Sequence, residues 1–173
     1  MRTIKLLSVL SLFILSACSS VSVNTDYDKK ANFAGYKTYA YLKSGVDKAQ
    51  ISDLDKKRIL YAIDEVMTAK SFTKSENPDV FVSIFTQERE RVDVYNNYGF
   101  GWGWRPYWGV GYATPVTSTE GTLIIDIIDA KTKELVWQGK GSGYLTQNVD
   151  KKDARIKEFV TKILEKYPPQ LKQ

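Results

Sequence analysis

Thr122-Leu123-Ile124-Ile125-Asp126-Ile127-Ile128-Asp129 is the strongest strand pattern in the chain. Its large aliphatic side chains alternate between two faces, with Leu123, Ile125 and Ile127 on one and Ile124 and Ile128 on the other. This alternation predicts a β-strand that is buried on both sides. A turn at 130–133 follows, and Leu135-Val136-Trp137 begins a return strand that continues toward Tyr144. The two segments therefore predict an antiparallel hairpin.

One amphipathic helix is predicted before this hairpin and one after it. Ser52 offers an N-cap for the first helix, which is expected to end near Lys70. Asp150 is expected to cap the second helix, and Pro168-Pro169 stops it. Each helix has one apolar stripe at spacings of three and four, made by Ile59, Leu60, Ile63, Val66 and Met67 in the first and by Ile156, Phe159, Val160, Ile163, Leu164 and Tyr167 in the second.

Further strand patterns lie at 36–41 and 80–85, with a charged extension over 87–94 and a possible first strand at Val21 and Val23. Two helices with single apolar stripes can cover one face of a sheet built from hairpins and adjacent strands. We therefore expect an α+β fold, with an antiparallel sheet of four to five strands and two amphipathic helices packed on one face.

The N-terminus has the pattern of a secretory signal peptide over residues 1–17. Arg2 and Lys5 are followed by an apolar stretch that is too short to span a bilayer, and then by small residues. The exit Leu15-Ser16-Ala17-Cys18 resembles the bacterial lipobox, in which the cysteine thiol receives a diacylglyceryl group. Cys18 is the only cysteine of the chain, so no disulfide partner competes for it.

The residues after Cys18 indicate to which membrane the protein is sorted. Ser19 and Ser20 follow the cysteine, and the absence of Asp at this point favours the outer membrane under the sorting rule of enteric bacteria. We therefore expect a lipid anchor in the outer membrane and a domain that faces the periplasm. The predicted organisation is a signal peptide at 1–17, a lipidated N-terminus and tether at 18–26, and a single α+β domain at 27–173.

Composition excludes several classes of chemistry. The chain has no histidine, and its one cysteine is the predicted lipid carrier. The usual zinc, copper and iron sites and the Ser-His and Cys-His nucleophile pairs are therefore not available. The net charge of +5 falls to +3 without Arg2 and Lys5, and most basic residues are interleaved with acids, which argues against nucleic-acid binding. We expect no enzyme activity, no cofactor and no metal.

The segment 96–115 is a glycine- and aromatic-rich insert and the best candidate for a binding function. Its rings could stack on sugars or lie at a membrane interface. The candidate binding residues are Trp102, Trp104, Arg105, Tyr107 and Trp108. The alternative is that these rings fold back on the sheet or pack against a partner subunit.

Alternating charges at Glu88-Arg89-Glu90-Arg91 place two carboxylates on one face of a strand. A carboxylate pair could serve glycoside chemistry or hold calcium. A charged strand edge that discourages pairing with another chain accounts for the same pattern, and we favour this interpretation.

Several motifs occur together in this order: the lipobox, Tyr36-Lys37-Thr38-Tyr39-Ala40-Tyr41, Asn77-Pro78-Asp79-Val80, the glycine/aromatic insert, the 122–126 strand and Leu135-Val136-Trp137-Gln138-Gly139. The chain thus resembles the bacterial lipoprotein family called domain of unknown function 4136 over nearly all of its mature length. This resemblance implies an α+β fold and a location in the cell envelope, but it identifies no catalytic residues.

These observations predict a non-catalytic envelope lipoprotein that binds another envelope component or helps an assembly in the outer membrane. Its partners would be the membrane, through the lipid on Cys18, and an envelope protein or a glycan. The alternative is a glycan or small-ligand binding module that uses the aromatic insert.

The Cys18→Ser variant should accumulate as an unlipidated precursor, because only the thiol can form the thioether to the lipid. Labelling with a radioactive fatty acid is the measurement, and it should tag the wild-type protein and not the variant. Equal labelling of the two proteins would exclude Cys18 as the lipid carrier.

Overall fold

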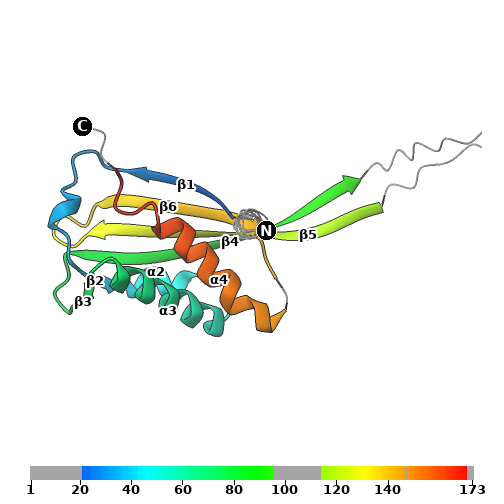
Figure 1. Cartoon of the computed structure of the whole chain (residues 1–173), viewed down its shortest axis with the longest axis horizontal. Coiled ribbons are helices and arrows are strands. Elements are labelled where there is room, and N and C mark those ends of the chain that lie inside the picture. The colour runs from blue at the N-terminus through cyan, green and yellow to red at the C-terminus, as the bar shows by residue number, and fades with distance from the viewer. Residues whose placement is uncertain (1–20, 96–113, 147, 171–173) are drawn as a thin grey trace, which may run out of the picture.

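The computed structural model describes residues 21–95, 114–146 and 148–170 (Figure 1). Over 89–95 and 114–119 it describes the backbone. The predicted signal peptide and Cys18 lie outside the described residues. The sequence was compatible with either a tether or a first strand at residues 21–26. In the structure these residues belong to a strand.

Within the described residues, six strands form one sheet in the order β1-β6-β5-β4-β2-β3. They are β1 (Val21–Tyr27), β2 (Thr38–Tyr41), β3 (Thr73–Lys74), β4 (Val80–Tyr95), β5 (Thr114–Asp129) and β6 (Leu135–Tyr144). The predicted hairpin is β5–β6, which pairs antiparallel with Ile127 opposite Trp137. The charged extension after residue 85 is part of β4, which runs for 16 residues.

The expectation of a purely antiparallel sheet with four to five strands was wrong. The sheet is mixed, because β2 pairs in parallel with both β3 and β4. The chain leaves β2 through two helices before it returns to the sheet, and a return of this kind brings the next strand back in the same direction. The two-residue strand β3 is too short to leave a pattern in the sequence.

In the part of the chain that the structure describes, three α-helices accompany the sheet: α2 (Lys43–Lys48), α3 (Asp53–Ala69) and α4 (Val149–Leu164). The Ser52 side chain accepts a hydrogen bond from the Asp55 N–H, so the predicted cap of α3 is confirmed. Asp150 is not the cap of α4. Asn148 caps it by accepting from the Asp150 N–H, and Asn148 and Asp150 are both residue types that commonly cap helices. The short helix α2 was not predicted.

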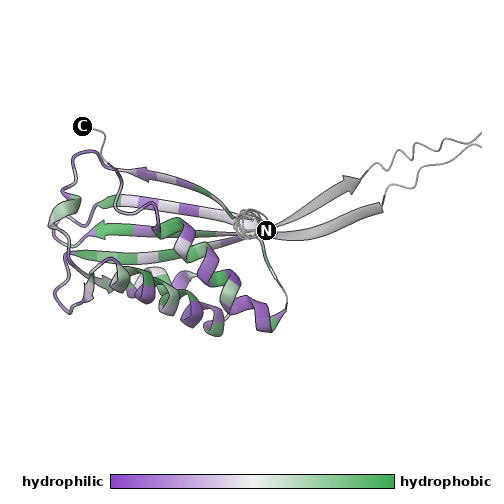
Figure 2. Ribbon diagram, viewed as in Figure 1, coloured by the Kyte–Doolittle hydropathy of each residue, from purple (hydrophilic) through white to green (hydrophobic). Residues whose placement is uncertain are grey.

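The core lies between one face of the sheet and the stripes of α3 and α4. Figure 2 shows hydrophobic residues concentrated on β4 and β5, with hydrophilic residues along the helices. Trp137 is completely buried. A Cβ on Gly139 would lie 2.3 Å from the Trp137 ring and 2.5 Å from Ile163, so glycine at this position lets α4 approach β6.

The opposite face of the sheet contains a small buried polar group. Asp126 of β5 accepts a hydrogen bond of 2.7 Å from the Gln138 side chain. Ser83 lies opposite Asp126 in the β4–β5 register, and its buried hydroxyl has no hydrogen-bond partner. Burial raises the pKa of Asp126 and outweighs the opposite effect of the Gln138 hydrogen bond.

Trp137→Ala should lower the free energy of unfolding by about 3–5 kcal/mol, because it removes a fully buried ring from a packed core. Denaturant unfolding of the full chain is the measurement. Leu135→Ala is the matched control on the same strand, since Leu135 is 48% exposed. A Trp137 variant that unfolds together with this control would contradict the packing.

Asp126→Asn should stabilise the protein at pH 7. The folded pKa of Asp126 is raised, so the ionised form lowers stability above the unfolded pKa, and this loss fades as the pH falls through the folded pKa. The advantage of Asp126→Asn, measured by denaturant unfolding, should therefore shrink on acidification toward the unfolded pKa of about 3.9.

Asp129→Asn provides the control of opposite sign. Hydrogen bonds from the Thr132 N–H and the Tyr36 hydroxyl hold the pKa of Asp129 below its usual value despite partial desolvation. Its ionised form therefore stabilises the fold above the unfolded pKa, and Asp129→Asn should lose stability at pH 7. The same sign for both substitutions would contradict the burial argument.

Candidate functional site

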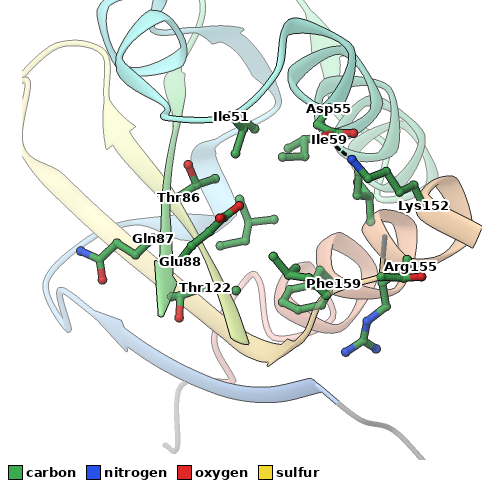
Figure 3. Close-up of a pocket in the computed structure, with 15 residues that line it drawn as sticks. Ile51, Asp55, Ile59, Thr86, Gln87, Glu88, Thr122, Lys152, Arg155 and Phe159 are labelled. Atoms are coloured by element: carbon green, nitrogen blue, oxygen red, sulfur yellow. Dashed lines mark hydrogen bonds and ion pairs between the residues drawn. The ribbon is translucent and has the colours of Figure 1, made fainter. Parts of the chain in front are cut away.

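A cavity of about 160 Å³ opens between the first turns of α3 and α4 and the strands β4 and β5 (Figure 3). Apolar side chains make most of its wall, and polar groups lie around them. The apolar wall consists of Ile51, Ile59, Leu123, Leu145, Ile156 and Phe159. A dry cavity of about this size can hold a small apolar group such as a benzene ring.

Two charged residues of the cavity wall, Asp55 and Lys152, form an ion pair. Lys152 of α4 bonds to Asp55 of α3 at 2.9 Å, and Arg58 bonds to the other oxygen of the same carboxylate at 2.8 Å. Burial raises the pKa of Asp55, but the hydrogen bonds from Lys152, Ser52 and Arg58 outweigh this effect and lower it. The Lys152–Asp55 pair therefore joins the two helices at the cavity wall.

Arg155 closes a second part of the wall. Its Nε donates to the Tyr144 carbonyl at 2.9 Å, and its guanidinium lies 4.7 Å from the centre of the Phe159 ring. One of its terminal nitrogens also donates to Glu158 at 2.6 Å. The arginine thus ties the end of β6 to α4, and its planar group covers an aromatic ring of the cavity.

Leu145 and Thr86 lie in the wall of the cavity. Leu145 packs directly on the backbone at Gly121, where an added Cβ would lie 2.5 Å from a Leu145 methyl group. Thr86 lines the cavity from β4, but its hydroxyl is fully buried, without a hydrogen-bond partner among the described residues, and does not face the cavity. The cavity can therefore bind a small apolar group.

A two-stranded arm begins beside this cavity. β4 pairs with β5 along the whole length of both strands, from Val80 opposite Asp129 to Tyr95 opposite Thr114. β6 reaches β5 only as far as the Tyr144–Glu120 pair, and β2 reaches β4 only at Val80–Val82. Within the described part of the chain, strand segments 89–95 and 114–119 therefore pair only with each other, and they project past the sheet (Figure 1).

The aromatic candidates Trp102, Trp104, Arg105, Tyr107 and Trp108 lie outside the described residues, between the two strands of the arm. Of the carboxylate pair considered from the sequence, Glu88 lines the cavity, whereas the Glu90 side chain is not described. The sequence did not predict the cavity, because its walls come from five separate segments. Leu145, a large apolar residue directly after a strand, was the one available hint.

Two kinds of structural feature are absent from the described ranges. Residues 21–95, 114–146 and 148–170 contain no group of three or more acidic residues, cysteines or histidines placed to hold a metal ion. In these ranges, no helix combines the length and the hydropathy that a membrane crossing requires.

Solved structures show where this fold occurs. A PDZ domain protein from Parabacteroides distasonis is similar with a TM-score of 0.54 and 14% sequence identity. The match covers 95% of this chain but 40% of that protein, so this chain spans less than half of its length. The PelC dodecamer from Paraburkholderia phytofirmans is also similar, with a TM-score of 0.45 and 12% identity, over 83% of this chain and 95% of that one.

No curated protein matches the chain. The family model described as domain of unknown function (DUF4136) matches residues 23–169, which include every strand and helix named above except the first two residues of β1. The chain therefore belongs to the DUF4136 family.

Proposed function

We propose that this protein is a non-catalytic envelope lipoprotein, anchored by the lipid on Cys18 to the outer membrane and facing the periplasm. Its domain binds another envelope component, or takes part in an assembly, through the arm made by β4 and β5. The observation that carries this proposal is the arm itself, in which two strands leave the sheet and pair only with each other over the described residues.

A two-stranded ribbon is at best marginally stable in water when nothing else packs on it. Each strand of the arm has one side paired with the other strand, and its outer side offers main-chain N–H and C=O groups to a further strand. An incoming chain can satisfy these groups, as in β-strand addition. A ribbon of this kind is therefore better suited to a bound partner than to isolation.

The glycine/aromatic segment supports the same proposal from the sequence. Residues 96–113 connect the two strands of the arm in the sequence, and Trp102, Trp104 and Trp108 belong to this segment. Tryptophan and tyrosine are enriched where proteins bind one another, because a large rigid ring loses little conformational entropy on binding. Stacking of the same rings on sugars is the basis of the alternative, a glycan-binding module.

Site-specific photocrosslinking in native membranes tests the proposal. A photoreactive residue at Val92, in the arm, should yield a crosslinked product with one envelope protein. The same residue at Thr132, in the exposed turn between β5 and β6, is the matched control and should not. Equal products from both positions, or none from Val92, would exclude the arm as the binding element.

Replacing Trp102, Trp104 and Trp108 together by alanine separates recognition from packing. If these rings recognise the partner, the Val92 product should disappear while the free energy of unfolding changes by less than about 0.5 kcal/mol. A loss of several kcal/mol would instead indicate rings packed in the domain. Tryptophan fluorescence that responds to cell-wall fragments, without a protein crosslink, would favour the glycan alternative.

A further inference from the structure

Exposed apolar side chains gather at one end of the domain. Among the described residues, seven large hydrophobic side chains are exposed. Three of them lie at a single end of the molecule, on the side of the sheet that the helices cover: Leu54 in the first turn of α3, Leu145 directly after β6, and Val149 in the first turn of α4. Val149 and Leu54 are 66% and 63% exposed, so each leaves most of an aliphatic side chain in water.

The structure brings these three residues to the same end through several contacts. α3 and α4 begin side by side, because Asp55 bonds to Lys152 at 2.9 Å and Arg58 bonds to Asp153. Arg155 joins the first turns of α4 to the Tyr144 carbonyl at the end of β6. Figure 1 shows both helices starting toward the end of the domain at which β6 ends and β1 begins.

The chain reaches its predicted anchor from this end as well. Val21, the first residue of β1, lies opposite Gly143, next to Tyr144. Cys18 is three residues before Val21. Three residues span at most about 10 Å even when fully extended, so a lipid on Cys18 keeps this end of the domain within that distance of the membrane surface.

We propose that Leu54, Leu145 and Val149 form a docking face that lies on the bilayer carrying the anchor. This inference rests on the proposed lipidation of Cys18. Aliphatic side chains leave water when they enter the interface between headgroups and acyl chains. The anchor keeps the domain close to the bilayer, and the docking face then fixes the orientation of the domain.

Charge does not select the lipid at this face. Lys151 and Lys152 stand beside Asp150 and Asp153, and two of these four residues are already in ion pairs with α3. Such a mixed surface gains little from anionic headgroups. The face therefore fits a zwitterionic phospholipid bilayer, and docking should change little with salt concentration.

The arm starts at the same end, which adds a geometric constraint. Its strands extend about 20 Å beyond the sheet, at roughly 3.3 Å per residue, whereas the tether spans at most about 10 Å. The arm is longer than the tether, so in a docked domain an arm that points toward the bilayer along its normal cannot stay outside the membrane. The arm therefore lies along the headgroup region or enters it, where a membrane partner could meet it.

Spin labels on the lipidated full chain test the docking face. Cys18 is the only native cysteine and its thiol is used by the lipid, so an introduced cysteine is the sole labelling site. Labels at Val149→Cys and Leu54→Cys report the face. Tyr61→Cys, two turns further along α3, and Leu135→Cys, at the far end of β6, are the exposed controls.

In phosphatidylcholine vesicles, labels at Val149 and Leu54 should collide several-fold less with a water-soluble nickel chelate than the control labels do. Their collisions with oxygen, which concentrates in the bilayer, should rise. The Leu54 and Tyr61 pair on one helix still decides the question if either of the other two variants does not fold.

The outcomes distinguish a failure of the docking face from a failure of the lipid anchor on which it depends. A protein that floats with the vesicles while all four labels stay equally accessible to nickel would overturn the docking face and leave the anchor intact. Labels at Val149 and Leu54 that are shielded from both nickel and oxygen would indicate a protein contact and would also overturn it. A chain that does not float, although Cys18 is present, would overturn the proposed function itself.

Discussion

The point at which β6 ends governs the rest of the molecule. β4 and β5 continue outward as a pair, but β6 stops at Tyr144, opposite Glu120, and the chain turns into α4. Arg155 takes the Tyr144 carbonyl as its acceptor, so the end of the strand is bonded to the helix. Because β6 stops there, the arm has no third strand, Leu145 can pack on Gly121 above the cavity, and α4 starts beside α3. The arm, the cavity and the exposed apolar end all follow from this one termination.

Much of the inner fold could be predicted because burial leaves a period in the sequence. Val80, Val82 and Ile84 are completely buried, as are Ile125 and Ile127, and their spacing of two marked β4 and β5. The pairing of the outer strands could not be read in this way, although a strand was predicted at 36–41, where β2 lies. β1 is short of large apolar residues and most of its side chains face solvent, and β2 joins through hydrogen bonds of Tyr39 and Tyr41 to Asp64 of α3. Such long-range contacts leave no local pattern, so the parallel pairing of β2 was missed.

The exposed apolar end of the domain was harder to predict than the fold. Its apolar residues, such as Leu54 and Val149, are isolated within polar sequence and look like ordinary surface residues until α3 and α4 are placed side by side. The cavity depends on a similar coincidence, because Thr86 and Phe159 approach each other only after both helices cover the sheet. The sequence contains a motif resembling a lipobox at Cys18 and an unusual aromatic insert. It could not show that β1 begins, and the arm leaves the sheet, at the same end of the domain.

The motifs behind the family resemblance lie mainly at the opposite end. Asp79, from Asn77-Pro78-Asp79, accepts bonds from the Lys37 and Thr38 N–H groups and the Thr38 hydroxyl, which joins the start of β4 to the start of β2. Tyr36 donates to Asp129 at 2.8 Å, and desolvation together with this bond raises the pKa of Tyr36 to about 12. Trp137 fills the core beside Tyr167. These residues hold strands and turns together. Family membership therefore accounts for the architecture, whereas the proposed function rests on the arm and on the exposed apolar end of the domain.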